Sequence, residues 1–208
     1  MDLYSYVVRY DSGFAPNPFY GYCTLATCKP PIRKSAKVGD WIIGSGSADK
    51  RIKQGDKLVY AMRVSEILSF NEYFNDPRFE GKKPILTGSR KQARGDNIYH
   101  QVGEEWQQLD SYHSHKDGSP NEDHIKRDTD VDKVLIGDQY IYFGADGPKI
   151  PDEFQSHGKS LCHSGIGRSK FSSDNENEKV MIDNFINWVN TLGVRGFVGH
   201  PYDWCDSQ

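Results

Sequence analysis

Residues 13–47 constrain the fold of this chain more than any other segment, because their first part cannot form a helix. Two prolines within residues 14–20 fix the backbone φ angle and push the residues before them toward extended geometry. We therefore predict a stiff loop that holds three aromatic rings out from the core. These rings are Phe14, Phe19 and Tyr20.

The end of the same segment, residues 39–47, predicts a turn, a buried strand that begins at Trp41, and a loop of glycine and serine. Glycine lets the backbone approach a ligand closely, and serine hydroxyls add hydrogen-bonding groups. Flat rings combined with such polar groups suit a flat polar ligand. A nucleobase is a ligand of this kind.

Several short runs of β-branched and aromatic residues, each bounded by turn residues, predict a fold dominated by strands. The predicted strands cover residues 4–10, 23–27, 41–44, 57–68, 139–143 and 194–199. Residues 70–132 are polar and predict a loop-rich insertion. Long irregular spans in a compact domain are usually functional or mobile.

One segment near the C-terminal end has a clear helical period. Residues 172–174 offer three N-cap side chains, and Gly193 follows Leu192 as a stop signal. The apolar residues of this helix should pack on the sheet as one stripe. They are Val180, Met181, Phe185, Trp188, Val189 and Leu192. Strands with one prominent helix indicate a mixed α+β fold.

Four stretches of the chain closely resemble the nucleotide modification associated domain 2 family. They are residues 11–47, KLVYAMRV at 57–64 with YFND at 73–76, DQYIYFG at 138–144, and Gly167-Arg168-Ser169 with the following helix. The resemblance covers nearly the whole chain and implies one domain over residues 1–208 with the insertion at about 70–132. That family occurs among phage and bacterial genes linked to hypermodified nucleotides. It implies a role in nucleotide modification or in phage defence.

GDWIIGSGS at residues 39–47, followed by KLVYAMRVSEI, is also similar to EVE and ASCH domains of the PUA-like superfamily. In those domains a small barrel binds modified bases, and ASCH-like relatives hydrolyse modified nucleosides. This second resemblance implies a PUA-like, barrel-type sheet with long loop insertions. It also implies a modified nucleobase, nucleotide or nucleic acid as the partner.

The charge and hydropathy patterns indicate a globular protein in the cytoplasm. No run of about 18 apolar residues occurs, and the N-terminal residues lack the pattern of a signal peptide, so we expect no membrane contact. The net charge is −3, which predicts weak binding to unmodified duplex DNA. A local basic strip at residues 29–53 lies beside the aromatic loop in sequence. It is either a ligand surface or a solvated loop.

The four cysteines are not paired in a CxxC motif, so we expect neither disulfides nor a zinc site. Cys23 and Cys28 lie five residues apart and would point to opposite faces of one strand. We interpret them as small core residues or residues near a site. A catalytic thiol at Cys28 is the alternative, and it requires an electropositive and accessible setting.

The polar middle of the chain contains a second group of candidate residues. Residues 94–100 place a cation, a carboxylate, an amide, a phenol and an imidazole close together. His113, His115, Asp117, Asp123 and His124 are metal-ligand types. Their spacing matches no zinc motif and their neighbours suggest a solvated loop, so we expect no metal and no cofactor. Residues 160–168 could instead bind an anion, but they lack the Lys-Ser/Thr ending of a P-loop.

Two classes of function are open from the sequence. The first is a binding module with an aromatic pocket, in which Ser45, Ser47 and Asn97 read the edges of a modified base. The second is an enzyme of the transferase or amidohydrolase type, in which Asp96, His100 or His113 is the acid or base and Lys29 or Arg168 stabilises negative charge. We favour binding, since no adjacent nucleophile and base are visible. The oligomeric state stays open. The candidate ligand-binding residues are Phe14, Asn17, Phe19, Tyr20, Lys29, Arg33, Trp41, Ser45, Ser47, Arg94, Asn97, Tyr99, His113, Ser164 and Arg168.

Overall fold

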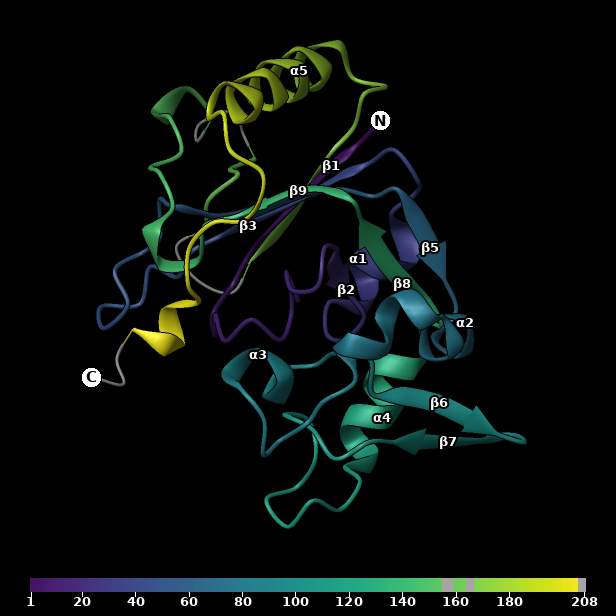
Figure 1. Ribbon diagram of the computed structural model, residues 1–208. Coiled ribbons are helices and arrows are strands. Elements are labelled where there is room, and N and C mark those ends of the chain that lie inside the picture. Colours follow the sequence, from purple (N-terminus) through teal and green to yellow (C-terminus); the bar gives the residue numbers. More distant parts are fainter. Residues whose placement is uncertain (155–158, 164–166, 206–208) are drawn as a thin grey trace. The chain divides into compact units, whose positions relative to one another are not determined.

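The computed structural model describes residues 1–154, 159–163 and 167–205, which form two compact units. The sheet unit comprises Met1–Asp11, Ala36–Val64 and the described part of Asp138–Gln208. The insert unit comprises Ser12–Ser35 and Ser65–Gly137. Figure 1 lets the reader follow these segments by colour along the chain. The single domain that the sequence resemblance implies stays a prediction.

The sheet unit is built on six strands among the described residues. Their order is β10 (Arg168–Phe171), β1 (Leu3–Val7), β3 (Trp41–Ser45), β4 (Leu58–Arg63), β9 (Gln139–Tyr142) and β11 (Gly196–Phe197). The pairs β1–β3 and β9–β11 are parallel, and the other neighbouring pairs are antiparallel. β10 and β11 form the two outer edges, so this sheet is open and the closed barrel is wrong for the described residues. The PUA-like assignment stays a prediction.

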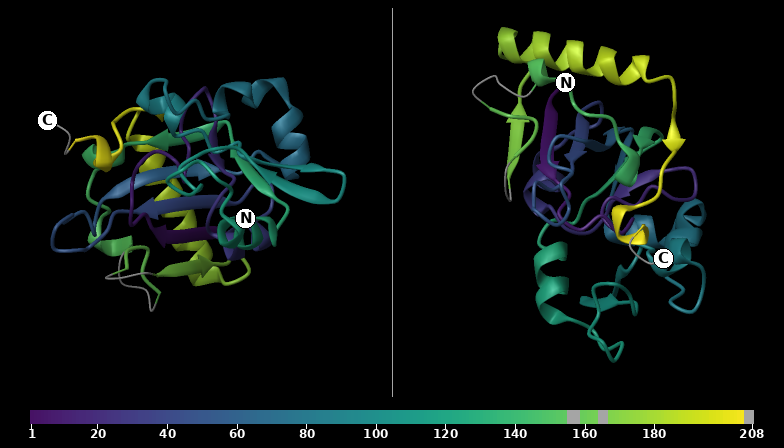
Figure 2. Two further views of the ribbon diagram at one scale, coloured as in Figure 1. Left: turned by 90° about the horizontal axis from the view of Figure 1, so that it is seen from below. Right: turned by 90° about the vertical axis from the view of Figure 1, so that its left-hand side faces the viewer.

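Helix α5 (Glu176–Thr191) covers one face of this sheet, as Figures 1 and 2 show. Asn175 caps its first turn by accepting hydrogen bonds from the backbone N–H groups of Asn177 and Glu178. Gly193 follows the helix in the left-handed region, with φ +68°. The predicted helix and its stop are therefore confirmed, whereas the cap predicted within residues 172–174 is wrong, because Asn175 makes the capping bonds.

The apolar stripe of α5 forms one core with the sheet. Met181, Phe185 and Val189 are buried against sheet residues that include Trp41 and Ile43. The stripe prediction is wrong for Val180, which is 55% exposed, while Ile182 is fully buried in its place. Short 3₁₀ helices complete the unit. They are η2 (Gly144–Asp146), η3 (Asp152–Phe154) and η4 (Tyr202–Trp204).

The insert unit has its own small sheet, a hairpin and short helices. The sheet order is β2 (Cys23–Leu25), β8 (Val134–Gly137), β5 (Glu66–Leu68), and the hairpin is β6 (Tyr99–Val102) with β7 (Glu105–Gln108). The helices are α1 (Pro30–Ser35), α2 (Phe70–Asn75), η1 (Pro77–Lys82), α3 (Arg90–Ala93) and α4 (Glu122–Thr129). The loop-rich insertion is thus largely short elements. Capping boxes at Ser69–Glu72 and Ser89–Gln92 explain how two of its helices form despite their length.

The long predicted strand at residues 57–68 is two strands in two different sheets. β4 ends at Arg63, and the backbone N–H of Ser65 donates to the carbonyl of Ile136 in β8. β5 then pairs antiparallel with β8. Sequence periodicity could not show this break, because both pieces are equally rich in strand-forming residues.

The proline-rich loop is packed inward, which corrects the prediction that its three rings are held out. Phe14 and Phe19 are each 2% exposed, whereas Tyr20 is 42% exposed. Phe14 belongs to the core of the insert unit. Hydrogen bonds from the side chain of Lys82 hold the loop against the insert unit, which keeps the Phe14 and Phe19 rings buried. Fully buried Lys82 donates from Nζ to the Asn17 Oδ1 (2.7 Å) and to the carbonyl oxygen of Tyr22 (3.0 Å).

None of the helices in the described part of the chain combines the length and the apolar character that a bilayer crossing requires.

Candidate active site

The insert unit contains a strained turn between β2 and α1. Cys28 and Lys29 both adopt left-handed backbone angles, with φ +60° and +44°. Residues with a side chain rarely adopt this region, and they persist there only where their surroundings hold them. The strand, turn and helix around Cys28 therefore present a thiol in an enforced position.

Arg33 holds this turn in place. It is fully buried, and its Nε donates to the carbonyl oxygen of Cys28 at 2.9 Å. Its two terminal nitrogens donate to the carbonyl oxygens of Asp128, Val131 and Lys133. Every bond of this guanidinium goes to the backbone, so Arg33 ties the Cys28 turn to the end of α4 rather than facing a ligand.

The thiol of Cys28 lies next to a histidine and an aspartate from distant parts of the sequence. Cys28 Sγ is 3.7 Å from His113 Nε2, and His113 Nδ1 is 3.0 Å from Asp128 Oδ2. Cys28 is half-buried, His113 is 7% exposed and Asp128 is fully buried. Thiol, imidazole and carboxylate therefore form one continuous chain of contacts, which is the arrangement of a nucleophile, its base and an orienting group.

Asp128 is the anchor of this arrangement. Its carboxylate accepts hydrogen bonds from the backbone N–H of Cys28 (3.1 Å), the Tyr99 hydroxyl (3.0 Å) and Arg127 Nε (3.1 Å), in addition to His113. Burial alone would raise the pKa of this carboxyl, but the bonds to His113 and Arg127 outweigh it and lower the pKa to about 2. Asp128 is therefore ionised at any physiological pH.

His113 is held as a strong base. Burial lowers its pKa, but the hydrogen bonds to Asp128 and Cys28 raise it by more, so that the pKa is about 8. The bond to Asp128 places the Nδ1 proton on the carboxylate side. In the neutral imidazole, which forms as the pH rises through about 8, Nε2 therefore faces the thiol as an acceptor. The network thus assigns the tautomer that can remove a proton from Cys28.

Two neighbouring rings pack against His113. The Phe14 ring lies 4.6 Å from it, and the His124 ring lies 4.4 Å from it. The Nδ1 atom of His124 is buried and has no hydrogen-bond partner among the described residues. The buried Phe14 ring therefore packs against the imidazole of His113 and does not form an exposed stacking surface.

Exposed groups surround this cluster. The side chain of Arg127 is 45% exposed, and Tyr112, next in sequence to His113, is 46% exposed. The guanidinium of Arg94 lies 4.4 Å above the Tyr112 ring. A cation and a flat ring are thus accessible close to the buried base.

The structure brings some of the predicted ligand residues together and separates others. Tyr99 and His113 both bond to Asp128, and the Phe14 ring packs against His113. The Phe14 ring also packs against Tyr112, over which the Arg94 guanidinium lies. Asn17 and Asn97 are at most 1% exposed, and their amides bond to the backbone. Lys29 is half-buried in the Cys28 turn.

Other predicted residues belong to the sheet unit. Ser45 is fully buried, and Ser47 is 6% exposed and accepts a bond from the Asp49 backbone. Arg168 is exposed on β10, while Trp41 is buried beneath α5. Ser164 lies outside the described residues. In the described part of the chain, no group of three or more His, Cys, Asp or Glu could hold a metal ion.

Sequence reasoning missed Asp128 and Arg127, although a signal for Asp128 exists. Ile125 and Asp128 lie three residues apart on α4 and are its buried residues. A carboxylate on the apolar side of a helix needs partners, because an unpaired buried charge is costly.

The family model described as nucleotide modification associated domain 2 matches residues 1–208, the whole chain. The chain belongs to this family. No curated protein and no solved structure matches it. The family fixes a context of nucleotide modification, and the chemistry must be argued from the site.

Proposed function

We propose that this protein is an enzyme of nucleotide modification in which Cys28 is the nucleophile, His113 the general base and Asp128 the orienting carboxylate. The observation that supports the proposal is the continuous contact chain from Sγ through the imidazole to a fully buried carboxylate. The left-handed Cys28 backbone is a second support, because strain of this kind gathers at functional sites.

The reaction that suits these groups is acyl transfer. His113 Nε2 takes the thiol proton, and Sγ forms a bond to the carbonyl carbon of an amide or ester. The bond from that carbon to the leaving nitrogen or oxygen breaks, and His113 returns the proton to the leaving group. Water, activated by the same base, then hydrolyses the thioester and regenerates the thiol. No external oxidant or reductant is needed.

The nucleotide modification context of the family supports a modified nucleotide or nucleoside as the class of substrate. A modified nucleotide or nucleoside that carries an acyl group on an exocyclic nitrogen presents the required carbonyl carbon. The exposed Arg127 and Tyr112 side chains supply a cation and a flat ring near the base for the nucleotide part. The proposal is therefore an amidohydrolase or acyltransferase that acts on modified nucleotides.

Base binding on the proline-rich loop, which the sequence favours, has less support. Stacking there requires exposed rings, and Phe14 and Phe19 are each 2% exposed. The sequence could not favour the enzyme, because Cys28 and His113 are 85 residues apart.

Thiol alkylation tests the proposal without knowledge of the substrate. Iodoacetamide at neutral pH should label Cys28 faster than the exposed Cys205, as followed by peptide mass spectrometry. His113→Gln should remove this advantage, while His115→Gln, which changes an exposed histidine nearby, should keep it. Equal rates at the two cysteines in the native protein would contradict the proposal. An unchanged rate in a folded His113→Gln variant would do the same.

A panel of N-acylated nucleosides then tests the reaction. The native protein should release the free nucleoside, and Cys28→Ala should release none while its circular dichroism spectrum is kept. If Cys28→Ala retains full turnover, the thiol is not the nucleophile.

A further inference from the structure

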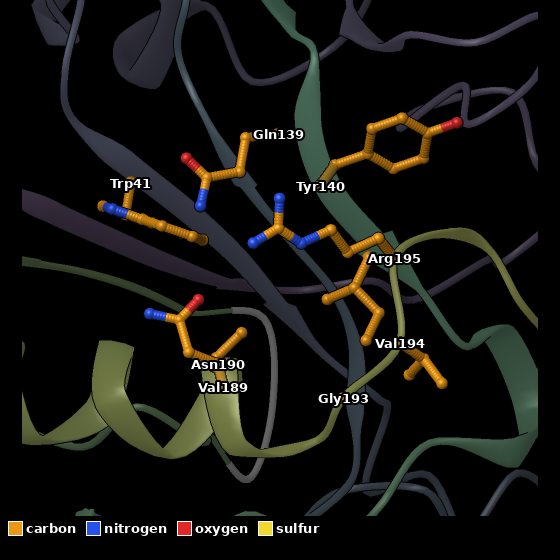
Figure 3. A pocket seen from close by; sticks show the side chains of 9 residues that line it. Trp41, Gln139, Tyr140, Val189, Asn190, Gly193, Val194 and Arg195 are labelled. Carbon is orange, nitrogen blue, oxygen red and sulfur yellow. The ribbon is translucent and has the colours of Figure 1, made fainter.

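The sheet unit contains a cleft that the proposed chemistry does not use. It measures about 180 Å³ and lies where the end of α5 meets β3 and β9. Figure 3 shows the indole of Trp41, the amides of Gln139 and Asn190 and the guanidinium of Arg195 around the same space.

One wall of the cleft is apolar and aromatic. The indole of Trp41 lines it together with Ile141, Val189 and Val194. Trp41 is only 4% exposed and belongs to the core, so its position is fixed by packing. A rigid wall of this kind accepts the flat face or edge of a ring without paying for side-chain ordering.

Three of the other lining side chains are polar and have no partner in the described part of the chain. The side chains of Gln139, Asn190 and Arg195 make no hydrogen bond or ion pair with any residue in the described part of the chain. Gly193 and Gly196, both with positive φ, shape the turn that brings Arg195 back over the cleft after α5. Two amides and one guanidinium therefore face a common space with their donors unused.

The contribution of Arg195 to the stability of α5 explains only part of this arrangement. A cation that follows a helix C-terminus interacts favourably with the helix dipole, which accounts for the charge at Arg195. It does not account for two carboxamides that face the same space beside an indole. Groups that converge on a cleft with no partner of their own indicate a ligand.

We propose that this cleft binds a purine ring with two adjacent acceptors, as on the carbonyl and ring-nitrogen edge of guanine. The planar fork of Arg195 matches such an edge with two parallel hydrogen bonds, and the Gln139 and Asn190 amides serve further polar atoms of the ring. The volume of about 180 Å³ is below the usual range of about 300 to 1,000 Å³ for small-molecule sites, so the ring enters and the sugar stays outside. This proposal does not depend on the Cys28 chemistry.

Titration calorimetry with guanosine, adenosine and inorganic phosphate tests it. Guanosine should bind, and adenosine should bind about tenfold more weakly, because its exocyclic donor replaces the carbonyl acceptor. Inorganic phosphate should not bind in the cleft. Arg195→Gln should weaken guanosine binding about tenfold. Arg9→Gln, which removes an exposed arginine of the same unit outside the cleft, should leave it unchanged.

Several results would overturn the proposal. They are no guanosine binding at millimolar concentration, equal affinity for adenosine, competition by inorganic phosphate, or a loss caused by Arg9→Gln and not by Arg195→Gln. Cys28→Ala should bind guanosine as the native protein does. A failure of the native protein in the alkylation or turnover assays would therefore count against the enzyme proposal alone.

Discussion

The Cys28 site and the Trp41 cleft are both polar, but their side chains are used in opposite ways. At the Cys28 site every polar group of the chain from thiol to carboxylate is bonded to another, and the carboxylate alone has four donors. In the Trp41 cleft the amides and the guanidinium have no partner among the described residues. In the proposed enzyme, the first pattern sets the protonation and orientation of the reactive sulfur. The second leaves hydrogen-bonding capacity for a ligand.

The largest test of this contrast is the removal of one committed group. Asp128→Ala should lower the free energy of unfolding by about 3 to 5 kcal/mol, because it leaves buried donors and the Arg127 charge without their acceptor. It should also abolish the fast labelling of Cys28. Denaturant unfolding at pH 7 measures the loss.

The matched control removes an uncommitted group from a helix of the other unit. Asn190→Ala should change the free energy of unfolding by no more than about 0.5 kcal/mol. Similar losses for Asp128→Ala and Asn190→Ala would show that the contrast between the two sites is false.

The aromatic loop gives the next largest effect. Phe19→Ala should cost about 3 kcal/mol or more of stability, since the ring is 2% exposed and its removal leaves a cavity. Tyr20→Ala, which truncates the 42% exposed neighbour, should cost less than about 1 kcal/mol. Melting curves of both variants decide whether the loop is core. Equal, small losses would return the loop to the role of a ligand platform.

The smallest effect concerns pH. His113 has a pKa of about 8 in the folded protein against 6.5 in the unfolded chain, so the folded state binds the extra proton between these values. Its stabilisation, about 2 kcal/mol, should be complete below pH 6.5 and lost as the pH rises through 8. Unfolding measured from pH 6 to 9 should show this slope in the native protein and not in His113→Gln. A common slope in both proteins would show that His113 is not held by Asp128.

The sequence predicts those parts of the fold that depend on neighbours in the chain. Helix α5 is confirmed because its apolar residues and stop signal lie within about twenty residues of one another, although its cap is Asn175 and not one of residues 172–174. The strands of the six-stranded sheet other than β10 follow from local runs of β-branched and aromatic residues.

Features that depend on distant partners could not be predicted. Phe14 and Phe19 are buried because Lys82, more than sixty residues away in the sequence, holds their loop by a hydrogen bond to Asn17. Asp128 becomes a candidate site residue only through its hydrogen bonds to Cys28 and His113, which lie 100 and 15 residues away in the sequence. The same holds for the cleft, whose guanidinium and indole come from opposite ends of the chain.

The separation of 100 residues between Cys28 and Asp128 has a consequence during protein synthesis. A ribosome that adds about 5 to 20 residues per second needs roughly 5 to 20 s to cover this distance. The partner strand of β2, Val134–Gly137, is made still later. Until then Cys28 of the nascent chain lacks both neighbours. Its contacts with His113 and Asp128 can form only when the whole insert unit has left the ribosome.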